Sequence, residues 1–323
     1  MGVGVGIVDT IHHLENELGQ HVVGQECCIR DLCEDPPAKT GTHGEWVLDI
    51  ATFFAPESSY YLYLSAEQVD NEDGEENISI SQMSLARAVS SAIEDGIDIL
   101  NISAGRSRPN CIEGNCAYCS EVRRAARNGI TVIGSAGNHP NDVVHCPSNT
   151  PEAISVGGAE VECTYNMPRV PQNPTNKPPQ AYWTKLWSDW DGYPDSAARG
   201  AYCTTRNCSS NGGSCDQHQN PTGWDRNPVS SGRKPDILSP VHYAAELTDG
   251  HPFVWAASSF AAPVVAGALA GILSDIAPGV SPVRAQDAIR NASVDIGAAS
   301  AGLFHAGGTQ DTLLEGSDVE VDD

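Results

Sequence analysis

Short apolar segments alternate with longer helical patterns along most of the chain, and this alternation constrains the fold more than any other feature. The segments with a strand pattern are 3–8, 60–64, 97–102, 130–135 and 153–157. Helical spacing begins at 43 and also covers 82–95, 116–128, 259–274 and 281–291. Strands separated by helices pair in parallel through right-handed crossovers, and the helices then cover both faces of the sheet. We therefore expect a three-layer α/β/α fold with a mainly parallel, twisted sheet and a functional site at the carboxyl ends of its strands.

Residues 1–303 are expected to form one domain. A chain of 323 residues can bury a single sizeable core, and no internal repeat is visible in the sequence. Residues 163–232 are rich in Pro, Asn, Trp, Gly and Cys and are too long for a plain loop. They predict an irregular insertion over one face of the domain. Residues 304–323 are acidic and lack apolar periodicity, which predicts a disordered tail.

A serine lies where an apolar strand pattern passes into an apolar helix of small residues, within 255–267. In that position the unpaired N–H groups and the positive end of the helix can stabilise negative charge that develops beside Ser259. Because 253–273 carries no charge, a transmembrane helix is the alternative interpretation. Ser258, Ser259 and Pro263 favour a strand, a turn and a buried helix instead.

Two segments nearer the start supply groups that could activate this serine. Residues 5–10 form a buried-strand pattern that includes Asp9, where a carboxylate can orient an imidazole. His43 opens a segment with apolar residues at helical spacing, such as Val47 and Ile50. Taken singly, Asp9 could be a turn acid and His43 a surface or core histidine. The order Asp, His, Ser differs from the order in chymotrypsin-like and α/β-hydrolase triads.

Two strand patterns in the middle of the chain end in small residues. Residues 129–138 run into a turn that ends at Asn138, and glycine in that turn would let a substrate backbone come close. Residues 97–105 end in Ser-Ala-Gly.

Together and in this order, the segments resemble the motifs of the subtilisin-like serine proteases, the subtilases of peptidase family S8. The resemblance implies a serine endopeptidase that forms an acyl-enzyme, with Ser259 as nucleophile, His43 as general base and Asp9 as the residue that orients the imidazole. It implies that Asn138 donates to the oxyanion. The residues it implies for the substrate cleft are Ser103, Ala104, Gly105, Ser135, Ala136 and Gly137.

The sequence departs from the family pattern in two places. Ala257 and Ser258 stand where the family has glycine and threonine, and Glu45 and Trp46 stand where Thr-His is common. Neither change removes a group that performs chemistry. They leave open a second hypothesis, a catalytically silent subtilase-like protein that binds or scaffolds a partner.

The charge balance excludes a generic nucleic-acid binder. Asp and Glu number 42 against 18 Lys and Arg, which gives a net charge of −24, whereas nucleic-acid binding needs a basic surface. With four lysines against fourteen arginines, the acidic surface favours a halophilic protein that works in high salt. The alternative is that acidic segments such as 70–76 are simply solvated.

The expected partner is a protein or peptide substrate, with no nucleic acid, no membrane and a monomeric enzyme. The resemblance implies no cofactor; structural calcium, which is common in the family, is left open without assigned residues, and no metal ligands are predicted. The first strand pattern follows Met1 directly, with no signal peptide or pro-segment. We expect a cytoplasmic protein if the sequence is full length and a secreted one if it is a mature or truncated form.

The eleven cysteines complicate the assignment of this protein to a reducing, intracellular compartment. All but Cys146 fall within or beside expected loops, which favours disulfides. The alternative is a zinc site that uses Cys116, Cys119 and two other ligands. The spacing of Cys116 and Cys119 fits half of such a site, but no second C-x2-C is present, so disulfides are preferred.

Overall fold

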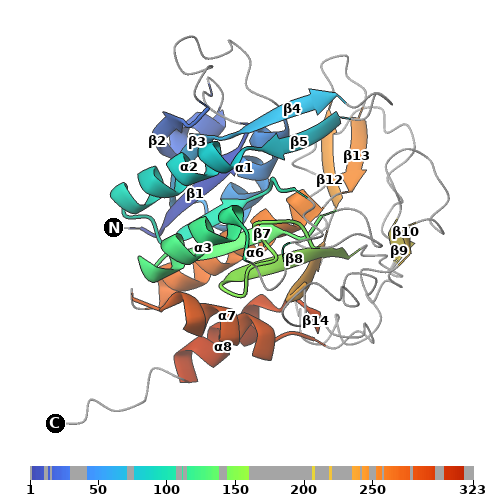
Figure 1. Cartoon of the computed structure of the whole chain (residues 1–323). Helices are drawn as coiled ribbons and strands as arrows, with labels where there is room; N and C mark the ends of the chain where they lie inside the picture. Colours follow the sequence, from blue (N-terminus) through green and yellow to red (C-terminus); the bar gives the residue numbers. More distant parts are fainter. Residues whose placement is uncertain are drawn as a thin grey trace.

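The computed structural model describes residues 2–10, 14, 17–29, 42–70, 76–106, 111, 115–137, 144–159, 206–207, 218–219, 235–240, 242–246, 252–256, 258–276, 279–294 and 302–315. At its centre lies an eight-stranded sheet in the order β14-β11-β8-β7-β6-β1-β3-β2 (Figure 1). Every pair of neighbours in it is parallel. Its strands are β1 (Gly4–Asp9), β2 (Val22–Cys27), β3 (Ser59–Leu64), β6 (Ile99–Ile102), β7 (Thr131–Ser135), β8 (Ala153–Ala159), β11 (Ile237–Pro240) and β14 (Gly302–Leu303).

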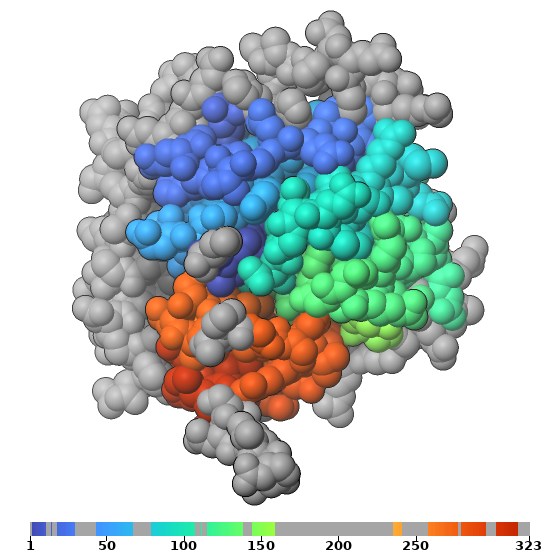
Figure 2. All heavy atoms as spheres, turned by 90° about the vertical axis from the view of Figure 1, so that its left-hand side faces the viewer, coloured from blue at the N-terminus to red at the C-terminus, as the bar shows by residue number. Residues whose placement is uncertain are grey.

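Helices cover both faces of this sheet, so the predicted α/β fold is confirmed. One face packs against α1 (Thr42–Phe54), α6 (Ser258–Asp275), α7 (Pro282–Asn291) and α8 (Ala306–Glu315). The other face packs against α2 (Gln82–Glu94) and α3 (Ala117–Arg127). Figure 2 shows one side of the molecule, where N-terminal (blue), central (green) and C-terminal (orange) segments follow one another from top to bottom.

The strand β1 lies between β6 and β3 and is buried along its whole length. A strand buried on both faces needs a continuous apolar run, and Val5, Ile7 and Val8 supply it. Gly6 keeps the strand close to its surroundings, since a Cβ there would lie 2.6 Å from Ile97 Cδ1 and 2.8 Å from a Tyr63 ring carbon. The last residue of β1 is Asp9, which the fold therefore places at the carboxyl edge of the sheet centre.

The helix α6 is the central helix of its layer. Most of its residues are buried, and it contacts α1 more extensively than any other element. The approach is close because residue 267 is glycine: a Cβ at Gly267 would lie 2.5 Å from the carbonyl oxygen of Ala51 in α1. Among the described residues, α6 alone is long and apolar enough to cross a membrane, but 78% of its residues are buried inside the protein, as in a core helix.

Three small antiparallel ribbons stand apart from the main sheet. They are β4 (Ala66–Asp70) with β5 (Glu76–Ile80), β9 (Arg206–Asn207) with β10 (His218–Gln219), and β12 (His242–Glu246) with β13 (Pro252–Ala256). The apolar strand expected before Ser259 is β13, and it pairs with β12 rather than with the parallel sheet. The predicted insertion at 163–232 lies outside the described residues, except for β9 and β10.

The expectation of a disordered tail from 304 is wrong for its first part. Residues 306–315 form α8, and Phe304 and Leu313 are buried in the same core as α6. The peptide N–H of Phe304 also donates to the carbonyl of Leu238 in β11, at 2.8 Å. Two apolar side chains and this sheet contact help to dock the segment, although the sequence shows no helical periodicity there. Residues 316–323 lie outside the described residues.

Candidate active site

Asp9, His43 and Ser259 come from three different elements and meet in one hydrogen-bonded chain. Asp9 ends β1, His43 is the second residue of α1, and Ser259 is the second residue of α6. His43 Nδ1 lies 2.8 Å from Asp9 Oδ1, and His43 Nε2 lies 3.0 Å from Ser259 Oγ. Since an ionised carboxylate only accepts hydrogen bonds, Nδ1 carries the proton and Nε2 is left to accept from the serine hydroxyl.

Thr10 fixes the carboxylate of Asp9 relative to the helix that carries His43. The Thr10 peptide N–H donates to Asp9 Oδ1 at 2.7 Å, and the Thr10 hydroxyl donates to the same oxygen at 3.2 Å. The Thr10 hydroxyl oxygen also accepts from the peptide N–H of Gly44, at 3.2 Å. That N–H lies in the first turn of α1 and has no acceptor within the helix. One threonine therefore orients the acid and caps the helix of the histidine.

The carboxylate of Asp9 is fully buried, and its second oxygen has no hydrogen-bond partner among the described residues. A buried carboxylate in a region of low dielectric interacts strongly with any nearby cation. The adjacent group able to take up a positive charge is the imidazole of His43, which is bonded to Oδ1. The carboxylate therefore holds the His43 ring with Nδ1 directed at it.

The backbone of Ser259 is held by a contact that a proline makes possible. Pro263 lacks an N–H, so it cannot give the helical hydrogen bond to the carbonyl of Ser259, four residues before it. The hydroxyl of Ser103 donates to this carbonyl instead, at 2.8 Å. The side-chain amide of Asn101 donates in turn to the Ser103 hydroxyl, at 3.0 Å. The strand β6 thus anchors the first turn of α6.

Ser258 links the first turn of α6 to the segment after β7. Its hydroxyl oxygen accepts from the peptide N–H of Gly137 at 3.1 Å, so the serine in the family's threonine position makes a specific bond. Gly137 has φ of 105°, a conformation that side-chain-bearing residues avoid, and a Cβ there would lie 3.0 Å from the ring of His145. Ala257, the other departure in this segment, lies outside the described residues.

Aromatic packing holds the imidazole from the side. The ring of Phe260 lies 5.5 Å from the ring of His43, and Trp46 packs edge-on against Phe260 with centroids 6.0 Å apart. The Trp46 departure is therefore part of the packing between α1 and α6. The ring of Phe260, packed against Trp46, limits the positions open to the His43 ring, which helps to keep Nε2 directed at Ser259.

The residues predicted to line a cleft follow two neighbouring strands. Residues 103–105 continue β6 and 135–137 end β7 and continue beyond it, so both lie at the carboxyl edge beside Asp9. Ala136 uses its peptide groups internally, because its N–H donates to Val156 O and its carbonyl accepts from His145 N–H. Asn138, the predicted oxyanion donor, lies outside the described residues.

Four residues with clear positions around this site were given no role by sequence reasoning: Thr10, Asn101, Ser258 and Phe260. Thr10, Ser258 and Phe260 are chain neighbours of Asp9 and Ser259, so adjacency to a predicted site residue was an available signal. The contact of Ser103 with the Ser259 carbonyl spans 156 residues, and only the missing N–H of Pro263 hinted that an outside donor was needed.

Comparison with known proteins gives the family. The subtilase family model matches residues 68–310, about three quarters of the chain. The chain belongs to the subtilase family. The matched range includes Ser259, whereas Asp9 and His43 lie before it. A curated subtilase, the subtilisin-like protease SBT3.6 of Arabidopsis thaliana, is 27% identical over 116 residues. That alignment covers 35% of this chain and 14% of the plant protein, so the chain spans only a small part of this relative.

Solved subtilase structures share the fold over nearly the whole chain. The self-cleaved protease domain of PatA gives a TM-score of 0.59 at 17% identity, with 97% of each chain covered. The prenylagaramide maturation protease PagA gives 0.57 at 16% identity and covers 96% of this chain and 93% of its own. A cold-adapted subtilisin-like serine proteinase gives 0.54 at 16% identity, with 94% and 87% covered. At these identities the likeness describes the fold alone.

Proposed function

We propose that this subtilase is a serine endopeptidase that cleaves protein or peptide substrates with Asp9, His43 and Ser259 as its catalytic triad. The observation that carries the proposal is the continuous hydrogen-bonded chain from Asp9 through His43 to Ser259, with separations of 2.8 Å and 3.0 Å. A nucleophile in contact with a base that is itself oriented by a third group is the arrangement that activates a serine hydroxyl.

The reaction follows from the direction of these bonds. Ser259 Oγ attacks the carbonyl carbon of the scissile peptide while its proton passes to His43 Nε2. The buried carboxylate of Asp9 stabilises the imidazolium and keeps the remaining N–H on Nδ1. The imidazolium then protonates the amine that leaves, and an acyl-enzyme remains on Ser259. Water, activated by the same imidazole, releases the second product.

Negative charge on the substrate oxygen needs hydrogen-bond donors. The peptide N–H of Ser259 lies in the first turn of α6, where N–H groups have no acceptor within the helix and the dipole favours an anion. We assign it as one donor of the oxyanion hole, and we retain the side chain of Asn138 as the second on the sequence resemblance alone. Both would act mainly in the transition state, when the charge is fully developed.

The segment 103–105 is the better candidate for pairing with the substrate backbone. It continues β6 at the edge beside the triad, and the peptide groups of Ala104 and Gly105 make no hydrogen bond within the described part of the chain. An extended peptide can add to such an edge as a further strand. Residues 135–137 would serve as a wall, since the N–H groups of Ala136 and Gly137 are already bonded.

A fluorophosphonate probe tests the proposal on the whole chain. We expect wild-type protein to be labelled on Ser259, Ser259→Ala to remain unlabelled, and Ser274→Ala, a matched serine of the same helix, to label like wild type. Labelling should be lost in wild type after denaturation, because it depends on His43. A folded wild-type protein that resists the probe and leaves peptide substrates intact would support the catalytically silent binding protein instead.

A further inference from the structure

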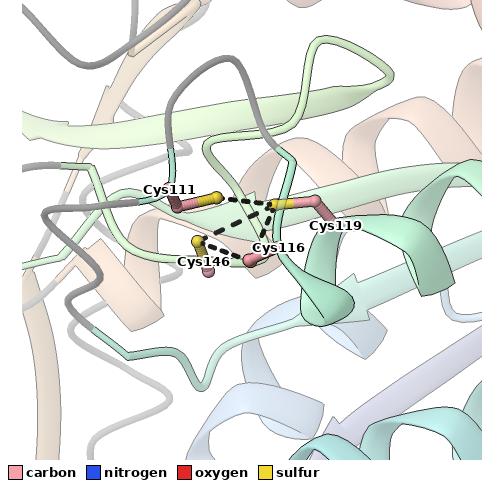
Figure 3. A group of neighbouring side chains, drawn as sticks. All are labelled: Cys111, Cys116, Cys119 and Cys146. Carbon is pink, nitrogen blue, oxygen red and sulfur yellow. Dashed lines mark hydrogen bonds between the residues drawn. The ribbon is translucent and has the colours of Figure 1, made fainter.

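Four cysteines, three of them between residues 111 and 119 and the fourth at residue 146, place their sulfur atoms together (Figure 3). Cys116 precedes α3, Cys119 lies in its first turn, Cys111 comes from the segment after β6, and Cys146 from the segment before β8. Neighbouring Sγ atoms are 3.2 Å apart for Cys116 and Cys146, 3.3 Å for Cys116 and Cys119, 3.5 Å for Cys111 and Cys119, and 3.7 Å for Cys119 and Cys146. All four lie within 4.8 Å of one another.

The preference for disulfides among these residues is wrong, because all four are thiols. Cys27, by contrast, is disulfide-bonded. Cys28 is a further buried thiol, outside the group of four. Three members of the group are buried and Cys116 is half-buried. Thiols are weak hydrogen-bond donors and acceptors, so their mutual contacts alone give little reason for four to converge in a core.

We propose that Cys111, Cys116, Cys119 and Cys146 bind a structural zinc ion. In a tetrahedral site with Zn–S bonds of about 2.3 Å, the sulfur atoms lie about 3.8 Å from one another. The observed separations are close to this value and much longer than the S–S bond of about 2.05 Å in a disulfide. Four thiolates around one point complete the coordination of the ion, which is the mark of a structural rather than a catalytic site.

The local sequence and structure fit zinc. Cys116 and Cys119 have the C-x2-C spacing of zinc ligands, at the N-terminus of a helix that favours the thiolate form. Each thiol gives up its proton on binding, so the site should lose its ion in acid. A cluster of several iron atoms would hold its thiolates farther apart than a single ion does. The compact group is therefore a mononuclear site.

The ion would fasten together the two segments that leave β6 and β7. Arg106 and Cys146 form a two-way backbone bridge of 2.8 Å and 3.0 Å, and the Asn149 side chain donates to the carbonyl of Cys111. His145, next to Cys146, donates its peptide N–H to the carbonyl of Ala136. Its ring lies so close to Gly137 that a Cβ there would be 3.0 Å from it. The zinc site thus stands directly behind 103–105 and 135–137, the walls of the proposed substrate cleft.

Metal content of the full chain, purified without metal-affinity resin, tests the proposal directly. We expect about one zinc ion per chain in wild type, and a loss of most of it in Cys119→Ser and Cys146→Ser. Cys28→Ser, which changes a buried thiol outside the group, should keep its zinc. Ser259→Ala should also keep it, so the result does not depend on the proposed protease function. Cobalt in place of zinc should give the visible absorption bands of tetrahedral thiolate coordination.

Because the serine variants could fail to fold, wild type supplies a second measurement. A strong chelator should lower its melting temperature, and added zinc should restore both the melting temperature and, if the protease proposal holds, peptidase activity. After denaturation with chelator and no reductant, all four cysteines should be alkylated. Wild type without bound metal, peptide mapping that finds two disulfides among the four, or equal zinc loss in Cys28→Ser would each overturn the proposal.

Discussion

At the scale of single residues, Pro263 leaves a buried backbone carbonyl that needs a hydrogen-bond donor from outside the helix. A proline in the second turn of α6 frees the carbonyl of Ser259, and the hydroxyl of Ser103 satisfies it. Both groups are buried, so this contact is part of the fold as well as of the site. The same hydroxyl accepts from Asn101, which makes Ser103 the link between β6 and the nucleophile.

We expect Ser103→Ala to leave the Ser259 carbonyl without a donor and to lower the free energy of unfolding by about 1–3 kcal/mol. Turnover should fall as well, because the first turn of α6 loses its anchor. Urea unfolding measures the first effect and peptide hydrolysis the second. In a Pro263→Ala background a helical N–H becomes available at 263, so the same serine change should cost clearly less. An equal cost in both backgrounds would show that Ser103 stabilises the site by some other route.

The site residues that could be predicted from the sequence are those that lie beside a recognisable strand or helix pattern. Asp9, His43 and Ser259 each close or open a strand or helix pattern, and the structure brings them within hydrogen-bonding distance. Contacts between distant segments carry no such signal. Cys146 lies 27 residues from Cys119, with no second C-x2-C beside it, so only the fold reveals that they meet.

At the scale of elements, the crossing of α1 over α6 sets the distance between His43 and Ser259. Gly267 allows the two helices to approach until a Cβ would lie 2.5 Å from Ala51 O. Gly271, one turn later, faces the carbonyl of Phe54 at a milder 3.2 Å. The sequence predicted both helices but gave no indication of this contact, because close packing depends on which faces meet.

Gly267→Ala should therefore destabilise the protein, although alanine is the better helix former by about 1 kcal/mol. Overpacking of this kind typically costs about 1–3 kcal/mol, which outweighs the gain in helix propensity. The kcat of the folded variant should also fall, because separating the helices lengthens the distance between His43 and Ser259. Gly271→Ala is the matched control and should be nearly neutral. If thermal unfolding and kcat respond alike in the two variants, the crossing at Gly267 has no special role.

The elements missed by the sequence were those with little chain-local pattern. β13 was expected as a strand, but its sequence gave no indication that it pairs with β12, whose residues lie 6 to 14 positions before their partners. α8 was missed because Phe304 and Leu313 are too few to give an apolar periodicity, and its other contacts, such as the bond from Arg284 to the carbonyl of Leu313, involve distant segments. The central strands of the parallel sheet could be predicted because each is a short, mostly apolar segment between helical patterns.

At the scale of the whole molecule, the net charge of −24 is the dominant property. Repulsion among unpaired carboxylates opposes the compact state, and dissolved ions screen it. We expect the melting temperature to rise with KCl and to rise most steeply below about 0.5 M, where the screening length shortens fastest. A melting temperature that stays constant or falls with KCl would show that repulsion among the acidic side chains does not destabilise the fold. A purely linear rise up to molar salt would point to ion exclusion from the surface instead.

The distance along the chain between the parts of the site has a consequence for synthesis. Ser259 lies 216 residues after His43. The strand β11 of the same sheet pairs with β14, which is formed by residues Gly302–Leu303 still later in the chain. A ribosome delivers residues in order, so a growing chain carries its acid and its base long before it has a nucleophile. If the proposed triad is correct, the enzyme cannot cut itself or its neighbours until nearly all of the domain has emerged. The order of the three residues in the sequence then delays proteolytic activity until translation of the domain is almost complete.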